Sequence, residues 1–384
     1  MVSAAKIDIK SLLLDELQEK VLQLGEPSYR AGQIADWLYK KRVDAVEQMT
    51  DLPRLLRARL VETFSFSKID IVRVLGSRDT TRKFLFRLGD GNLIESVLIP
   101  ASPALYGEKA DRRTICISTQ VGCAYGCKFC ASGLDGFSRN LRANEIIDQI
   151  IAIESASGKK IDNIVFMGMG EPLANLENVM RAIGIINAPW GLGIGARRIT
   201  VSTSGLAPQI KKLADDPLQI RLAVSLHGAT DEVRNQIMPI NRRYNIETLL
   251  SACDYYAAHK KQRLTFEYIL IANVNDSDEQ ARILSRHARR LSAKVNLIPY
   301  NTVAGLPWSR PLQNRQEKFL SILRKQGIPA TLRREKGRDI DAACGQLRLQ
   351  TKQVRDGSPS RPYSDASARP AVAPYQNILR ANGS

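Results

Sequence analysis

The stretch Val121-Gly122-Cys123-Ala124-Tyr125-Gly126-Cys127-Lys128-Phe129-Cys130 carries three of the six cysteines in this 384-residue chain. The spacing is Cys-x3-Cys-x2-Cys, so a single short loop presents three thiols. Cysteine thiolates at this density are typical of iron–sulfur sites, and a [4Fe–4S] cluster ordinarily takes four of them. A loop with three leaves one iron without a protein ligand, which favours a catalyst that binds and reduces a small molecule.

A structural zinc site is the alternative interpretation of the same loop. Such sites are usually four-coordinate and are commonly built from two separated pairs of Cys or His. No second pair is apparent, because the remaining cysteines and the histidines stand alone in the sequence: Cys116, Cys253, Cys344, His227, His259 and His287. Six cysteines are also too sparse for a disulfide framework, and free thiols with an oxygen-sensitive cluster indicate a reducing cytoplasm.

The charge is strongly positive and unevenly distributed. The formal net charge is +17, yet residues 1–70 sum to zero and residues 71–350 carry +14. Concentrated positive charge favours a polyanionic partner such as nucleic acid, with a solvated basic surface as the plain alternative. The N-terminus has no secretory signal pattern, and no run approaches the ~18 apolar residues of a membrane span. We therefore expect no membrane association.

The pattern along the chain changes near residue 70. Leucines at helical spacing within residues 11–64 predict a small helical module over residues 1–69. Alternating strands follow over residues 70–112, and the run Gly89-Asp90-Gly91-Asn92 predicts a hairpin turn between two of them. The tail, residues 351–384, is rich in Pro, Ser, Ala and Arg without an apolar period, and we expect it to be disordered.

Strands and helices alternate over residues 113–350, which predicts a parallel α/β sheet. The expected strands are Thr114–Ser118, Ile164–Gly168, Ile199–Thr203, Leu222–Leu226, Leu264–Leu270 and Lys294–Pro299, with a further short strand at Ala330–Arg333. Six strands fall short of the eight of a closed (β/α) barrel. The fold class expected is therefore a partial (β/α)6 barrel, with the N-terminal helical domain and a small antiparallel β extension.

Small and polar residues gather where these strands end, which is where parallel β/α folds bind ligands. The cysteine loop follows the first strand, and the second, third, fourth and sixth strands end in Met167–Leu173, Ser202–Gly205, Ser225–Gly228 and Pro299–Asn301. Each signal is weak alone. Placed together on one rim, they predict a ligand site beside the cysteine loop. Gly170 would let the backbone approach the ligand, and the Glu171 carboxylate would bind its ammonium group.

These motifs together resemble the RlmN family of radical S-adenosylmethionine (SAM) RNA adenine-C2 methyltransferases, relatives of the Cfr methyltransferases. The resemblance covers roughly residues 10–350. It rests on Cys116–Cys123, Gly136–Leu141, Met167–Leu173, Ile199–Gly205, Ser225–His227, Met238–Asn241, Ile298–Asn301 and Ala343–Leu347, besides the cysteine loop. The N-terminal module likewise resembles that family's RNA-engaging accessory domain. The resemblance implies a radical-SAM partial barrel over residues 113–350 that includes a catalytic-cysteine loop.

The resemblance also implies roles for individual residues. Cys123, Cys127 and Cys130 would hold one [4Fe–4S] cluster, and each turnover would use two SAM molecules. Cys344 would accept a methyl group from one SAM, and a radical derived from the second would activate that methyl for addition to adenine. Glu95 would accept the proton from carbon 2, and Cys116 would attack the Cys344 sulfur and leave a transient disulfide. The implied SAM contacts are Gly170, Glu171, Ser202, Ser225, Leu226, His227 and Asn301, with Ser204 as an alternative to Ser202.

The implied RNA targets are 23S rRNA at the peptidyl-transferase centre and tRNA beside the anticodon. The implied electron donor is a flavodoxin or ferredoxin, and we expect a monomer. Two other functions stay open at this point. One is a Cfr-type methyltransferase that acts on carbon 8 of adenine. The other is a non-catalytic RNA-binding protein with a structural metal.

Overall fold

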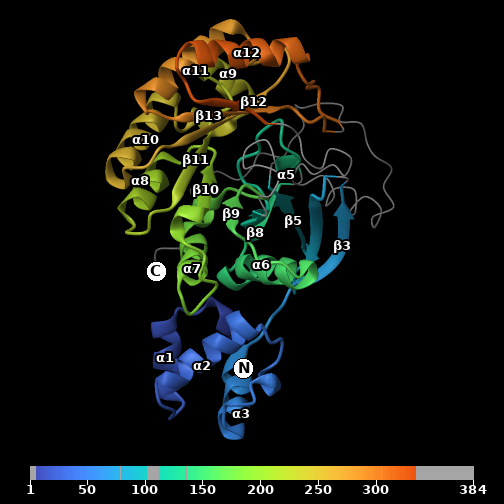
Figure 1. The fold of residues 1–384 in the computed structure, drawn as a ribbon, viewed down its shortest axis with the longest axis vertical. Helices are drawn as coiled ribbons and strands as arrows, with labels where there is room; N and C mark the ends of the chain where they lie inside the picture. The colour runs from blue at the N-terminus through green and yellow to red at the C-terminus, as the bar shows by residue number, and fades with distance from the viewer. Residues whose placement is uncertain (1–5, 78, 102–111, 135, 304, 334–384) are drawn as a thin grey trace.

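The computed structural model describes residues 6–77, 79–101, 112–134, 136–303 and 305–333. A helical N-terminal region lies at one end of the molecule, and a larger α/β region follows it (Figure 1). The Cys344 prediction and the predicted disordered tail fall outside the described residues.

The N-terminal region is built from short helices packed on their apolar faces. They are α1 (Leu14–Gln23), α2 (Tyr29–Ala35), the π-helical turn η2 (Asp36–Lys41) and α3 (Arg54–Thr63). Leu17 and Val21 of α1, Ile34 of α2 and Leu56 of α3 are buried together in the core, at the helical spacing expected from the sequence. A two-residue parallel pair, β1 (Ile7–Asp8) with β2 (Phe64–Ser65), joins the two ends of this region. The helical prediction is confirmed.

Ten strands form one continuous sheet, in the order β14-β13-β12-β11-β10-β9-β6-β5-β4-β3. The parallel strands are β6 (Arg113–Cys116), β9 (Asn163–Phe166), β10 (Ile199–Thr203), β11 (Arg221–Ser225), β12 (Thr265–Leu270), β13 (Lys294–Pro299) and β14 (Ala330–Leu332). The antiparallel strands are β3 (Asp70–Gly76), β4 (Arg82–Arg87) and β5 (Leu93–Pro100). The predicted hairpin is present, and β5 pairs with β6, so the β extension continues the main sheet. The mixed α/β class is confirmed.

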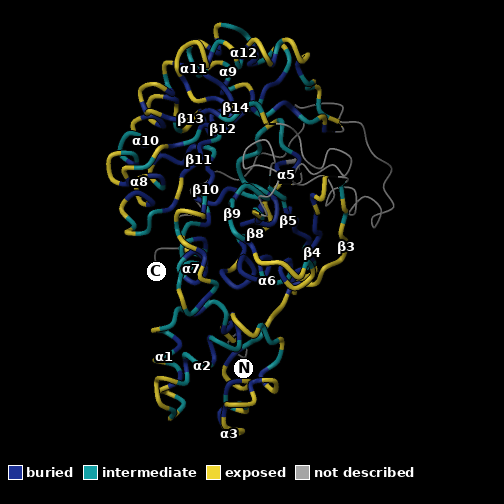
Figure 2. Tube along the Cα trace, in the orientation of Figure 1, coloured by how far each residue is buried: buried dark blue, intermediate teal, exposed yellow. Residues whose placement is uncertain are grey.

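Helices alternate with the parallel strands and cover the outside of the curved sheet (Figure 1). They are α6 (Ala143–Ser157), α7 (Leu176–Asn187), α8 (Ala207–Asp215), α9 (Asp231–Ile237), α10 (Ile246–Lys260), α11 (Asp278–Arg290) and α12 (Gln313–Lys325). Figure 2 shows buried residues along the strands and exposed residues on the outer helix faces. In α11, for example, Ala281, Leu284 and Ala288 are buried while the intervening arginines reach solvent. No helix in the described part of the chain has the length and apolar character to cross a membrane.

Ion pairs and hydrogen bonds join the N-terminal region to α6 and α7. Lys10 Nζ lies 2.5 Å from Asp148 Oδ1 of α6, and Arg181 Nη1 of α7 lies 2.5 Å from Glu16 Oε2. The Ser11 hydroxyl donates to Asn144 Oδ1 at 3.1 Å. Asp148 is buried, and this burial raises the pKa of its carboxyl group to about 7, although Lys10 opposes the shift. The junction therefore contains an acid that titrates near neutral pH.

Asp148→Asn tests this acid. Its pKa is higher in the folded chain than its ordinary 3.8, so the stability it contributes is present below about pH 4 and is lost as pH rises through about 7. The variant does not titrate at this position. The difference in free energy of unfolding, variant minus wild type, should therefore be about 1–3 kcal/mol more favourable to the variant at pH 8 than at pH 5. Urea unfolding at both pH values measures the difference, with Asp36→Asn on the surface as the control. A difference independent of pH would contradict the assignment.

Candidate active site

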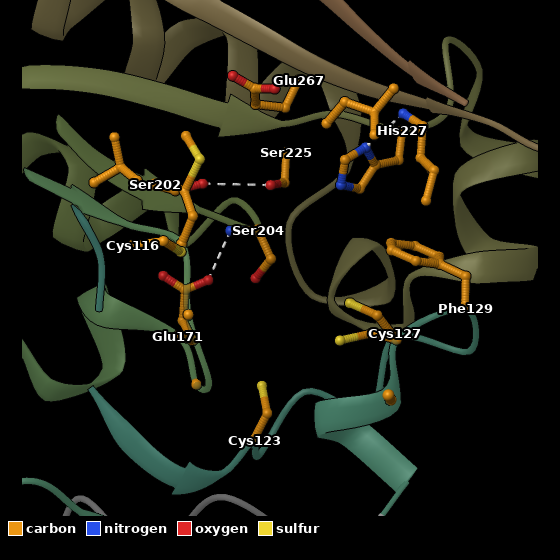
Figure 3. Close-up of a pocket in the computed structure, with 18 of the residues that line it drawn as sticks. Cys116, Cys123, Cys127, Phe129, Glu171, Ser202, Ser204, Ser225, His227 and Glu267 are labelled. Carbon is orange, nitrogen blue, oxygen red and sulfur yellow. Dashed lines mark hydrogen bonds between the residues drawn. The ribbon is translucent and has the colours of Figure 1, made fainter. Parts of the chain in front are cut away.

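A cavity of about 370 Å³ lies among the carboxyl ends of the parallel strands and the cysteine loop (Figure 3). Strands from both the parallel set and the antiparallel extension contribute to its walls. The lining includes Thr81, Val97, Cys116, Cys123, Cys127, Cys130, Gly170, Glu171, Ser202, Ser204, Ser225, His227, Glu267, Tyr300, Asn301 and Arg333. The motifs expected on one rim of the sheet therefore do meet around one space.

The cysteine loop is held by a small antiparallel pair that the sequence interpretation missed. Strand β7 (Gln120–Gly122) precedes the loop and β8 (Phe137–Asn140) follows it, and the two strands pair with each other. Gly122 has φ +78°, and a Cβ there would lie 1.9 Å from the carbonyl oxygen of Gly136. The Cys123 amide donates to that same oxygen at 3.0 Å. Only glycine permits this close approach, which sets where the first cysteine enters the cavity.

The far end of the loop rests on elements of the barrel. The Lys128 amide donates to the Ile237 carbonyl oxygen at 2.9 Å, and Trp308 Nε1 donates to the Lys128 carbonyl oxygen at 3.3 Å. The Phe129 ring meets the His227 ring edge-on, with centroids 5.0 Å apart. The loop therefore has fixed partners at both ends.

The three thiols are close enough to influence one another. The pKa of Cys123 is raised to about 12 and that of Cys127 well above its ordinary value. Burial is the main cause in both, and the neighbouring cysteines act in the same direction. Such thiols ionise when a metal supplies compensating positive charge. Three sulfur donors on one wall of a cavity, with oxygen and nitrogen groups opposite, fit an iron–sulfur cluster that keeps a face open to a ligand.

The Gly170-Glu171 turn was expected to let the backbone approach a ligand, but its closest contact is with another part of the chain. Gly170 has φ +97°, and a Cβ there would lie 2.5 Å from Cβ of Gln120, so the close approach is to the chain's own backbone and side chain. The Glu171 carboxylate accepts the amide of Ser204 at 2.6 Å and that of Leu173 at 3.1 Å. Burial raises its pKa, and these amides oppose the rise. The carboxylate is thus fixed in the cavity wall and ties β9 to β10.

Polar groups from adjacent strands face the cysteine loop (Figure 3). The Ser202 and Ser225 hydroxyls lie 3.4 Å apart across β10 and β11. His227 has φ +57°, and its Nδ1 accepts the Ile269 amide at 3.1 Å. Burial lowers the pKa of His227 to about 3, so the ring is neutral, and its proton is on Nε2 because Nδ1 is an acceptor.

A buried ion pair lies on the face of the β extension that includes cavity residues. Lys83 Nζ is 3.0 Å from Glu95 Oε2, and both side chains are fully buried. The register places Lys83 opposite Val97, and Val97 opposite Cys116. Paired residues of antiparallel strands share a face, so the ion pair and the Cys116 thiol lie on the same side of the sheet.

The structure brings most of the predicted residues together. Cavity-lining positions are taken by Cys116, Cys123, Cys127, Cys130, Gly170, Glu171, Ser202, Ser225, His227 and Asn301. Leu226 is buried and does not line the cavity, and its carbonyl oxygen accepts hydrogen bonds from its own chain. Glu95 lies on the cavity side of β5 without lining the cavity.

The sequence did not signal several charged residues in or around the site, among them Lys83, Glu267 and Arg234. Lys83 precedes the apolar run Phe84-Leu85-Phe86, and the hairpin register would have placed it beside Glu95. Glu267 is a buried carboxylate in the cavity wall that accepts Asn296 Nδ2 at 2.9 Å. Arg234 is fully buried in α9, and no sequence motif signalled it.

Comparison with known proteins agrees with this arrangement. Residues 117–283 match the family model described as the radical SAM superfamily, and residues 7–65 match the ribosomal RNA large subunit methyltransferase N-terminal domain. The crystal structure of a radical SAM methyltransferase from Sphaerobacter thermophilus superposes with a TM-score of 0.82 at 46% identity, covering 88% of this chain and 98% of that one. The fold and site therefore define a radical-SAM protein.

Curated relatives narrow the class. A probable dual-specificity RNA methyltransferase RlmN from Akkermansia muciniphila is 53% identical over 354 residues, covering 91% of this chain and 99% of that protein. A dual-specificity RNA methyltransferase RlmN from Syntrophotalea carbinolica is 44% identical over 365 residues, covering 95% of both. The chain belongs to the RlmN family.

Substitution of Gly122 tests the close approach that positions the loop. Gly122→Ala places a methyl group against the Gly136 carbonyl, so we expect at least about 2 kcal/mol of destabilisation and poor iron retention after anaerobic reconstitution. Gly91→Ala is the matched control, because Gly91 has φ +80° but open space around its Cβ position. It should cost about 1 kcal/mol and retain iron. Equal iron content in the two variants would refute the role of the contact.

Proposed function

We propose that this protein methylates carbon 2 of adenine in RNA by a radical-SAM reaction that uses Cys344 as the methyl carrier. The observation that supports this best is one cavity lined by Cys123, Cys127 and Cys130, with Cys116 in another wall, in a chain of the RlmN family. The RNA methyltransferase activity named for its relatives is the activity we assign to this chain.

The low reactivity of carbon 2 of adenine explains why the reaction would need a cluster, two SAM molecules and two further cysteines. This carbon lies between two ring nitrogens and is not nucleophilic, so it cannot displace a methyl group from a sulfonium directly. One [4Fe–4S] cluster on the three cysteines, with an open iron and two SAM molecules per turnover, would supply the radical chemistry. In this proposal the side chains around the cavity bind and orient SAM and the adenine beside the cluster.

Cys116 and Cys344 act as a pair in this proposal. Cys344 carries the methyl group, and the Cys116 thiolate then attacks the Cys344 sulfur. The carbon–sulfur bond breaks, its electron pair stays on the carbon, and the carbon takes up a proton to become the methyl group of the released RNA. The Cys116–Cys344 disulfide that forms would have to be reduced by an external dithiol before the next turnover. Cys116 lines the cavity, and so does Arg333, the last described residue. The eleven residues from Arg333 to Cys344 can span up to about 36 Å, which is enough to return Cys344 to the cavity.

Glu95 is the proposed acceptor of the carbon 2 proton. It lies on the same face of β5 as Val97 and Ile99, which line the cavity, and Lys83 fixes its carboxylate. The proposal therefore places the acceptor beside Cys116 at the edge of the site.

The proposed SAM contacts lie across the cavity from the cysteine loop. Gly170, Glu171, Ser225, His227 and Asn301 line this space, and both Ser202 and Ser204 do so too. A neutral His227 can donate from Nε2 without adding positive charge beside a sulfonium. Leu226 would contribute only through the position of its neighbours.

The proposed substrates are 23S rRNA at the peptidyl-transferase centre and the tRNA adenosine 3′ of the anticodon. The excess of positive charge in residues 71–350 supports a phosphate-rich partner. We further propose a monomer in the cytoplasm that receives electrons from a flavodoxin or ferredoxin, with the helical region at residues 1–69 engaging RNA.

RNA nucleoside mapping tests the proposed reaction. RNA from cells that express the protein should contain 2-methyladenosine, and RNA from cells that express Cys344→Ala should not, because the methyl carrier is missing. The two methyladenosines have the same mass, so liquid chromatography coupled to mass spectrometry identifies each by its retention time against a standard. 8-Methyladenosine would instead identify a carbon-8 methyltransferase, and full activity of the Cys344→Ala variant would refute the methyl-carrier role.

Cys116→Ala tests the resolving step. Without the Cys116 thiol, the thioether between Cys344 and adenine cannot be released, so a covalent protein–RNA adduct should accumulate. Denaturing gels followed by ribonuclease digestion measure it. Cys253→Ala is the control, since Cys253 is buried in α10 and does not line the cavity. Turnover by Cys116→Ala without an adduct would count against this role.

A further inference from the structure

Arg234 is a fully buried arginine on α9, the helix whose last residue accepts a hydrogen bond from the cysteine loop, and nothing above gives it a role. Its guanidinium donates from Nε to the Leu226 carbonyl oxygen at 3.0 Å and from Nη1 to Asn241 Oδ1 at 2.7 Å. Nη2 donates to the Ser204 carbonyl oxygen. All three acceptors are neutral, so each guanidinium nitrogen has a hydrogen-bond partner but the charge is not balanced.

An unbalanced buried charge is costly, because the protein interior solvates it less well than water. Among the residues that the structure describes, no carboxylate oxygen lies within the 4.0 Å of an ion pair with this guanidinium. Asp231 is linked to it only through Asn241, whose Nδ2 donates to Asp231 Oδ1 at 2.8 Å. Burial lowers the pKa of Arg234 to about 10, so the group remains a cation at neutral pH.

The position of Arg234 indicates which anion would balance it. It lies on α9, and the Ile237 carbonyl at the end of that helix accepts the Lys128 amide of the cysteine loop. The Arg234 guanidinium also donates to the carbonyl oxygens of Ser204 and Leu226. Ser204 lines the same cavity as the three cysteines, and so do the residues on either side of Leu226.

We propose that Arg234 is the counter-charge of an iron–sulfur cluster held by Cys123, Cys127 and Cys130, and that it makes this cluster easier to reduce. The inference rests on the cluster assigned under the proposed function. Reduction adds one electron from a low-potential donor and breaks no bond, so the cluster becomes more negative by one unit. A fixed positive charge nearby stabilises that form more than the oxidised form and raises the reduction potential.

A purely structural role predicts something different. Arg234 also ties the Ser204 and Leu226 backbones together, so its loss could disturb the cavity by geometry alone. In that case Lys and Gln at position 234 would both be harmful, since neither reproduces three hydrogen bonds. A charge role predicts that Lys preserves the potential and Gln does not.

The test is a redox titration of anaerobically reconstituted protein followed by electron paramagnetic resonance, with no RNA required. Arg234→Gln should lower the equilibrium constant for one-electron reduction about tenfold or more, which is about 59 mV for this couple. Arg234→Lys should stay within about threefold of wild type. Arg290→Gln removes the same charge from the exposed pair with Glu247 and Asp254 and should leave the potential unchanged.

Iron content and circular dichroism complete the comparison. A cluster that is lost from Arg234→Gln but retained in Arg234→Lys also supports the charge role. An unchanged potential in Arg234→Gln, or loss of the cluster from both variants, overturns it. Absence of any cluster from the wild-type protein would instead refute the proposed function. A wrong assignment of carbon 2 would leave the potentials unaffected.

Discussion

The burial of ionisable side chains around the cavity is the constraint on which the rest of the site depends. Four ionisable side chains are almost completely buried around it: Glu171 after β9, Lys83 and Glu95 on the antiparallel strands β4 and β5, and Arg234 on α9. Groups taken out of water must find partners within the chain. Glu171 uses two backbone amides, Lys83 and Glu95 use each other, and Arg234 is left with neutral acceptors. These buried groups thus fix the walls of the cavity and leave Arg234, among the described residues, with no carboxylate in hydrogen-bond contact.

Close backbone contacts hold the cysteine loop near the ends of the parallel strands. Gly122 sits against Gly136, and Gly168 sits so close to Ile117 that a Cβ would lie 2.6 Å from its carbonyl carbon. The first contact lies within the β7–β8 pair, and the second joins the segments that follow β6 and β9. The Gln120 amide of β7 donates to the Met169 carbonyl oxygen after β9 and so links the two. An open-faced cluster needs such a rigid support, because the ligand it binds is positioned by the opposite wall of the cavity. The glycines and the buried charges therefore serve the same geometry.

The sequence predicted much of this arrangement because local patterns carry the information. Helical leucine spacing predicted the N-terminal helices, and alternation of strands and helices predicted the parallel sheet and the edge where Glu171, Ser225 and His227 meet. The pair β7–β8 was missed, because two strands of three and four residues have too little periodicity to detect. Arg234 was missed because burial of a charge depends on packing from distant segments. The domain boundaries and the roles of Cys344, Cys116 and Glu95 stay predictions.

The central claim is that three cysteines hold an iron–sulfur cluster with one iron open to SAM. Protein purified without oxygen, analysed for metal and sulfide and then reduced with dithionite in the presence of SAM, tests it most directly. The account predicts about four irons and four sulfides per chain and formation of 5′-deoxyadenosine. Stoichiometric zinc without iron, or an intact cluster that leaves SAM uncleaved, would contradict it.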